Sequence, residues 1–165
     1  MSQNKLQARF NELFAYCPAT GKLFNNANRG KGKMGDEAGS NHNKGYRWVF
    51  VDGRRYLAHR VIWMMLYGNW PREIDHINHL RADNRLKNLR EVSQPENFRN
   101  QTKYTNNTSG VCGVVFNKRS GKWKAQMRVC GQSKGFGEYY HWFDAVCARK
   151  SAEHKYGFHI NHGRL

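Results

Sequence analysis

The spacing of apolar residues near the N-terminus changes from a helical period to an extended one. Residues 5–16 carry apolar side chains at positions 6, 10, 13 and 14, which lie on one face of a helix. Residues 16–24 contain Pro18 and Gly21, which predict an extended segment, a turn and a strand. Residues 25–45 are rich in glycine, asparagine and lysine and show no such period, so we expect a loop there.

A hairpin and a helix are predicted for the next segment. Residues 46–51 and 54–57 flank Asp52-Gly53, a dipeptide that is typical of tight hairpin turns. Residues 58–67 are strongly apolar and predict a helix, which Gly68 is expected to end as its C-cap. We interpret the methionine and tryptophan side chains of this helix as core.

Polar residues interrupt the pattern between residues 74 and 97. This stretch predicts two short strands joined by a polar loop, followed by the start of a helix. Ser93 and Glu96 have the spacing of a capping box, which fixes where that helix begins. We therefore expect Asn97, in the first turn, to point back toward the strand that carries Asp75.

Four side chains of this stretch could together hold a metal ion and move a proton: Asp75, His76, Asn88 and Asn97. Carboxylate and carboxamide oxygens suit a hard divalent cation such as Mg²⁺ or Mn²⁺. An imidazole with an ordinary pKa of about 6.5 can accept a proton at neutral pH. Because adjacent side chains of a strand point in different directions, Asp75 and His76 can address one phosphate from two sides. Asp83-Asn84 alone is more typical of a turn, and the ordered set of four is what indicates a site.

The second half of the chain has a different pattern. Three strands are predicted between residues 111 and 139, followed by a helix over 142–156. The middle strand has one apolar face and one polar face. We therefore expect one side of this sheet to be core and the other to be a row of hydrogen-bond donors. The donor face consists of Lys122, Lys124, Gln126 and Arg128.

The charge balance indicates a polyanionic partner. The chain has 165 residues, with 28 Lys and Arg against 12 Asp and Glu, a net charge of +16 and a pI of ≈ 10.1. These charges are scattered among aromatic residues, as in folded nucleic-acid-binding proteins. A membrane-surface protein is the competing interpretation, but no stretch approaches about 18 apolar residues and no basic amphipathic helix stands out. The first residues lack the apolar core of a signal peptide, which favours a cytoplasmic location.

Several motifs of the first half resemble the HNH endonucleases, in the variant whose last His is replaced by Asn. The resemblance implies a ββα-metal motif at about residues 72–100. It also implies that Asp75 and Asn97 hold one metal ion, that His76 deprotonates the attacking water, and that Asn88 fixes the loop that orients His76. The matching motifs are Asp75-His76, the run Asp83-Asn84-Arg85 followed by Asn88-Leu89, Asn97, and the upstream segments Gly45-Tyr46, 51–56 and 58–60.

Residues 107–158 resemble the DNA-binding domain of plant ethylene-response factors, the Apetala type. The resemblance implies that Gln126 and Arg128 face bases or phosphates in the major groove, with Lys124 and Lys118 beside them. It departs from the plant pattern in the first strand, where Val115 and Asn117 stand in place of arginines. The matching positions are Ser109-Gly110-Val111, Gly113-Val114, Gly121-Lys122-Trp123, Ala125, Gly137 and the alanine-rich helix.

Basic residues outside the metal motif are expected to bind DNA. The glycine-rich run over residues 25–45 is either a flexible loop or one that DNA orders, because glycine lets the backbone approach phosphates closely. His59 is interpreted as a structural or phosphate-contacting residue and His79 as a solvated turn residue, and neither as a metal ligand. The expected DNA-binding residues are Arg29, Lys31, Lys33 and Arg60 in the first half, and Lys118, Arg119, Lys122, Lys124, Gln126, Arg128 and Lys134 in the second.

The sequence thus predicts an α+β protein with a nuclease domain over residues 1–103 and a DNA-binding domain over 104–165. We expect a phage- or intron-encoded homing-type endonuclease that cleaves double-stranded DNA with one divalent ion, Mg²⁺ or Mn²⁺. One active site in one chain favours a monomer that nicks a single strand, or a weak dimer. If the protein is phage-encoded, its location is the host bacterial cytoplasm. The alternatives are a DNA-binding regulator with an inactive HNH module, a restriction-type or structure-specific nuclease, and an RNA-binding protein.

Overall fold

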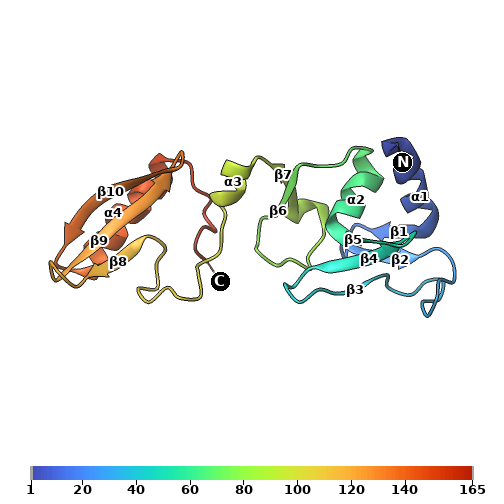
Figure 1. Ribbon diagram of the computed structural model, residues 1–165, viewed down its shortest axis with the longest axis horizontal. Helices are drawn as coiled ribbons and strands as arrows, with labels where there is room; N and C mark the ends of the chain where they lie inside the picture. The colour runs from blue at the N-terminus through green and yellow to red at the C-terminus, as the bar shows by residue number, and fades with distance from the viewer. Residues whose placement is uncertain (1, 165) are drawn as a thin grey trace. The chain divides into compact units, whose positions relative to one another are not determined.

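A computed structural model describes residues 2–164, which form two compact units that divide between Ser93 and Gln94 (Figure 1). Both units combine small antiparallel sheets with helices, so the α+β prediction is confirmed. None of the helices within residues 2–164 has the length and apolar character needed to cross a membrane.

The first unit begins with helix α1, Gln3–Leu13, and a hairpin of strands β1, Phe14–Cys17, and β2, Lys22–Asn25. The helix ends three residues before the predicted position. Phe14 already has extended backbone angles, φ −133° and ψ 144°, and pairs with Asn25 in the hairpin. The apolar residues at 13 and 14 are both buried, which the helical and the extended interpretation satisfy equally well.

The predicted hairpin of residues 46–57 is confirmed as strands β4, Arg47–Val51, and β5, Arg54–Leu57. Asp52 and Gly53 have φ of 47° and 80°, as a type I′ turn requires at both of its central residues. A short strand β3, Ser40–Asn41, pairs with the outer edge of β4 and completes a three-stranded sheet.

Helix α2, Ala58–Tyr67, follows β5 directly and forms the centre of the first core. It ends where predicted, at Gly68, whose φ of 72° is the left-handed conformation that favours glycine. Met64 and Met65 are buried in the core with Val61 and Ile62, so the prediction is confirmed for the methionines, whereas Trp63 is only half-buried.

Strands β6, Glu73–His76, and β7, Leu89–Val92, form an antiparallel pair that carries the candidate site. The loop between them ends in a short 3-10 helix, Leu86–Asn88. Helix α3, Gln94–Phe98, comes next in the chain and begins the second unit.

The second unit contains a three-stranded sheet in the order β10-β9-β8 with one helix against it (Figure 1). Its small core is made by Val114, Ala125 and Ala145, all completely buried. The elements are β8, Val114–Asn117; β9, Lys122–Val129; β10, Gln132–Tyr139; and α4, Trp142–Lys155.

Residues 99–103 belong to the second unit because their backbone pairs with residues 159–164. The domain boundary predicted from the sequence follows residue 103, and the division between the two units of the structure lies ten residues earlier. A polar segment such as 99–103 gives no sign in the sequence that a distant segment will pair with it. The three bonds are His159 N to Arg99 O at 3.2 Å, Gly163 N to Gln101 O at 2.8 Å, and Lys103 N to Arg164 O at 3.5 Å.

The second unit also buries a charged side chain, Arg149, which is only 3% exposed. Its Nε donates to the Cys112 carbonyl at 2.8 Å, and its Nη2 lies 3.3 Å from a carboxylate oxygen of Glu153 and 3.2 Å from Nε2 of His162. Burial lowers the pKa of Arg149, and the charge of Glu153 opposes that effect. A buried arginine therefore ties helix α4 to the loop before β8 and to the C-terminal segment.

Candidate active site

Asp75 and His76 are adjacent at the end of β6, and both side chains are buried, with exposures of 7% and 5%. Burial of two polar side chains side by side is costly unless each has partners. The two residues alternate along the strand, so their partners come from different directions.

The partner of Asp75 is Arg90, the residue opposite it in the β6–β7 register. Arg90 donates from Nε at 2.9 Å and from Nη2 at 2.7 Å, and both bonds end on Oδ2 of the carboxylate. Paired donors from one guanidinium hold a buried carboxylate in a fixed orientation. Arg90 was not predicted from the sequence, because the register of the two strands is not known without the structure.

The partner of His76 is Asn84, whose side chain is almost completely buried. Nε2 of His76 lies 3.0 Å from Oδ1 of Asn84. Because Oδ1 can only accept, Nε2 carries the proton in this pair, and the neutral imidazole has its lone pair on Nδ1. Burial lowers the pKa of His76 below its usual value, and the bond to Asn84 offsets part of that shift. The imidazole is therefore a neutral base at pH 7.

Two aromatic rings enclose the His76 imidazole. The His59 ring packs edge-on at 4.9 Å between centroids, and the Tyr46 ring lies at 5.9 Å. Nδ1 of His59 is buried and has no hydrogen-bond partner among residues 2–164. Burial lowers the pKa of His59 to about 3, so this second imidazole is neutral as well. Two neutral rings therefore cover the His76 imidazole, and its burial disfavours the protonated form.

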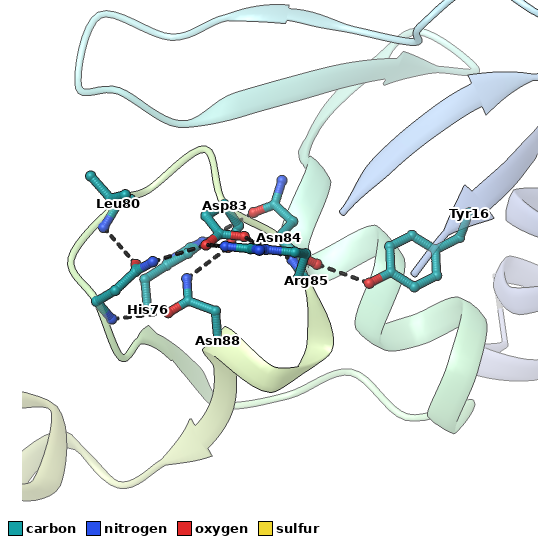
Figure 2. Close-up of polar contacts among 8 residues, drawn as sticks. Tyr16, His76, Leu80, Asp83, Asn84, Arg85 and Asn88 are labelled. Carbon is teal, nitrogen blue, oxygen red and sulfur yellow. Dashed lines mark hydrogen bonds and ion pairs between the residues drawn. The ribbon is translucent and has the colours of Figure 1, made fainter. Parts of the chain in front are cut away.

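Asn88 ties together the two ends of the loop between β6 and β7 (Figure 2). Its Oδ1 accepts from the backbone N–H of Asn78 at 2.9 Å, and its Nδ2 donates to the Asp83 carbonyl at 2.8 Å. The Asn88 carbonyl also accepts from the Ile77 N–H at 2.9 Å. Asn88 is itself buried, so its amide fixes the loop from the inside.

The Asp83 carboxylate accepts its hydrogen bonds from residues of this same loop. It accepts from Nε of Arg85 at 2.7 Å and from Nδ2 of Asn78 at 2.8 Å (Figure 2). The guanidinium of Arg85 is the main reason that the pKa of Asp83 falls to about 2. The motif contains the adjacent residues Asp83, Asn84 and Arg85. Their composition is typical of a turn, so the contacts that each one makes were not predictable from the sequence.

The expected metal ligands lie in different units. Asp75 is on β6 in the first unit, and Asn97 is on α3 in the second. Within residues 2–164 no group of three or more His, Cys, Asp or Glu side chains is placed to hold a metal ion. The carboxylate of Asp75 supplies oxygen donors next to an imidazole, and their chemistry fits a hard cation that keeps several waters.

The basic residues expected to bind DNA in the first unit differ in their exposure and in whether the protein already uses their donors. Lys31 and Lys33 are exposed. The Arg29 guanidinium lies 5.0 Å from the Phe14 ring and donates to the Phe50 carbonyl at 2.9 Å. Arg60 donates to two backbone carbonyls of the loop before β6, and burial lowers its pKa.

In the second unit, the basic residues lie on and around the β9–β10 hairpin. Arg128 is exposed, and its Nε donates to the Gly131 carbonyl at 2.9 Å in the turn. Lys118, Arg119 and Lys134 are exposed, whereas Lys122, Lys124 and Gln126 are half-buried.

A buried carboxylate with a fixed orientation, next to a neutral imidazole, can hold a cation and accept a proton at one place. Residues 56–99 match the model of a protein family described as HNH endonuclease, which places an HNH endonuclease domain in this part of the chain. No curated protein and no solved structure matches the chain. The matched stretch contains all four residues predicted for the site, together with Asn84 and Arg90.

Proposed function

We propose that this chain is a metal-dependent endonuclease that hydrolyses double-stranded DNA. The observation that carries the proposal is the buried bond between His76 and Asn84, beside Asp75 and inside the HNH match. This bond makes Nδ1 of His76 the proton acceptor, and burial keeps the imidazole neutral at pH 7. A neutral, oriented imidazole is what a general base requires.

In the proposed reaction, His76 takes a proton from a water molecule that attacks the phosphorus. The bond to the 3′ oxygen breaks, which leaves a 3′-hydroxyl and a 5′-phosphate, as the HNH resemblance implies. Arg90 orients the Asp75 carboxylate through its two hydrogen bonds. Asp75 would hold the divalent ion, which when bound stabilises negative charge on the phosphate oxygens as a Lewis acid.

The second unit is proposed to supply much of the DNA affinity, in the manner of a homing-type enzyme. Its support is a sheet whose core residues face α4, and a set of exposed basic side chains on the β9–β10 hairpin and the preceding turn. Lysine and arginine contacts to phosphate release counterions, so they give affinity that falls as the salt concentration rises.

A plasmid assay tests the nuclease proposal. Supercoiled plasmid is incubated with the protein in Mg²⁺, Mn²⁺ or a chelator, and the nicked and linear products are measured separately. His76→Ala should lower the cleavage rate by about 10²–10⁴-fold, because it removes a positioned general base. His154→Ala, an exposed histidine of α4, is the matched control and should cut like the parent. Equal rates for His76→Ala and the parent would refute the assignment of the base.

A salt titration tests the role of the second unit. Combined replacement of Lys118, Arg119, Lys124 and Lys134 by Ala should reduce the slope of log affinity against log salt by several units, at about 0.9 per phosphate contact. The cleavage rate at saturating DNA should change little. An unchanged slope would remove the DNA-binding role from this unit. Competition between duplex DNA and duplex RNA in the same titration tests the alternative of an RNA-binding protein, which should prefer the RNA.

A further inference from the structure

The hairpin β1–β2 contacts the loop that carries Asn84. The Tyr16 hydroxyl, on β1, donates to the backbone carbonyl of Asn84 at 3.1 Å (Figure 2). Tyr16 is half-buried and packs against the core of the first unit, so its ring is held in place independently of the loop. Tyr16 lies well before residues 56–99, and the HNH family match therefore does not include it.

The turn of the same hairpin packs against the same loop. Gly21 has φ of 75°, and its N–H donates to the Cys17 carbonyl at 2.8 Å. A Cβ added to Gly21 would lie 2.5 Å from the backbone N of Arg85 and 2.7 Å from the backbone C of Asn84. Backbone therefore meets backbone at this point, and only glycine allows the approach.

Asn84 is thus fixed from two sides. Tyr16 and Gly21 hold its backbone, and its side chain reaches Nε2 of His76. The loop's internal bonds hold the residues on either side of Asn84: Nδ2 of Asn88 donates to the Asp83 carbonyl, and the Asn88 N–H donates to the Arg85 carbonyl at 2.8 Å. The contacts from β1–β2 are the ones that reach the Asn84 backbone itself, so they can set the position of its amide against the imidazole.

We propose that Tyr16 and Gly21 are positioning residues for the general base, acting through Asn84 on the orientation and tautomer of His76. This inference rests on the proposed nuclease function, in which Nδ1 of His76 accepts the proton. The hairpin outside the HNH match is then part of the catalytic apparatus without touching substrate. A displacement of about 1 Å at a catalytic group can cost about 10²-fold in rate, far more than the loss of one hydrogen bond costs in stability.

The first test needs no DNA. Long-range ¹H–¹⁵N spectra of the full chain report which imidazole nitrogen carries the proton, and comparison with His76→Gln assigns the signals. We expect a single Nε2–H tautomer for His76 in the parent, and a mixture in Tyr16→Phe and Gly21→Ala. Tyr139→Phe is the matched control, since the Tyr139 hydroxyl makes the same kind of bond, 2.7 Å to the Phe136 carbonyl. Identical His76 signals in Tyr16→Phe and the parent would overturn the proposal, whether or not the protein cuts DNA.

The second test measures single-turnover cleavage and DNA affinity separately. Tyr16→Phe should lower the cleavage rate at saturating DNA about 10-fold with unchanged affinity, because the hydroxyl affects only the base. In an Asn84→Ala background, which keeps the backbone carbonyl, Tyr16→Phe should have almost no further effect. The same fold-change in both backgrounds would refute action through Asn84. If the parent itself does not cut in Mg²⁺ or Mn²⁺, the proposed function fails, and the tautomer comparison still decides the positioning role.

Discussion

Nε2 of His76 lies 3.0 Å from Oδ1 of Asn84, and both side chains are buried. The partner of the imidazole is thus a neutral amide. A carboxylate in the same place would also fix the ring, but it would stabilise the protonated form of the imidazole as well. The amide orients the base without raising its pKa above the usual range, since burial shifts that pKa downward.

Replacement of Asn84 by Asp should therefore move the pH dependence of cleavage. In the parent, the rising limb of the rate should have an apparent pKa below about 6.5, because burial lowers the pKa of His76. In Asn84→Asp the new carboxylate favours the imidazolium, so the limb moves to higher pH. Single-turnover rates between about pH 5 and 8 at fixed Mg²⁺ measure the shift. Coincident profiles would mean that His76 does not titrate on this limb.

Removal of Arg90 should destabilise the first unit, and a divalent ion should offset part of the loss. Arg90→Ala deletes two bonds to the buried Asp75 carboxylate, which should cost about 1–3 kcal/mol in the free energy of unfolding. An ion bound at Asp75 supplies positive charge in its place, so Mn²⁺ should raise the midpoint of thermal unfolding more in the variant than in the parent.

The matched control for Arg90 is Arg47→Ala, which breaks a 3.1 Å ion pair with Glu37 away from the site. Its unfolding midpoint should respond to Mn²⁺ as the parent's does. If Mn²⁺ raised the unfolding midpoint equally in the parent and both variants, Asp75 would not be a metal ligand.

His59 should make the first unit less stable in mild acid. The pKa of His59 is about 3 in the folded protein and about 6.5 in the unfolded chain, so only the unfolded chain binds its proton between these values. The contribution of His59 to the free energy of unfolding is fully present above about pH 6.5 and is lost as the pH decreases toward 3. The loss is roughly 2 kcal/mol between pH 6.5 and 5. Denaturant unfolding of the parent and of His59→Phe across this range checks the prediction. The variant should show the weaker pH dependence, and parallel curves would refute it.

The position of the unit boundary predicts which fragment folds. A fragment of residues 94–165 keeps the backbone bonds between residues 99–103 and 159–164, whereas a fragment of 104–165 loses them. Each such bond contributes about 0.5–1.5 kcal/mol, so the shorter fragment should unfold at lower temperature by circular dichroism. Equal midpoints would show that the paired segments add nothing to the stability of the unit.

Much of the local structure was predictable from the sequence because short-range signals specify it. Asp52-Gly53 determines its hairpin turn, and Gly68 ends helix α2 as expected. The end of α1 was not predictable, because Leu13 and Phe14 are both buried and fit a helix as well as a strand. The outcome depends on Phe14 pairing with Asn25, a tertiary contact.

The candidate site was predictable only as a set of residue types. Asp75, His76 and Asn88 were visible in the motif. Asn84 belonged to the same motif but was interpreted as a turn residue, and Arg90 was assigned no role. Their importance comes from burial and strand register, which one sequence without a structure does not reveal. The placement of Asn97 at the metal stays a prediction.

Burial of Arg149 has a consequence for synthesis on the ribosome. Its charge is compensated by Glu153 on the same helix, but its other partners include the Cys112 carbonyl and Nε2 of His162. The full set of partners is therefore present only after the segment that contains His162 has emerged from the exit tunnel. The first unit ends at Ser93, so all of it has been synthesised before the second unit begins. We therefore expect the first unit to fold while the second is still incomplete and its apolar residues are open to chaperones.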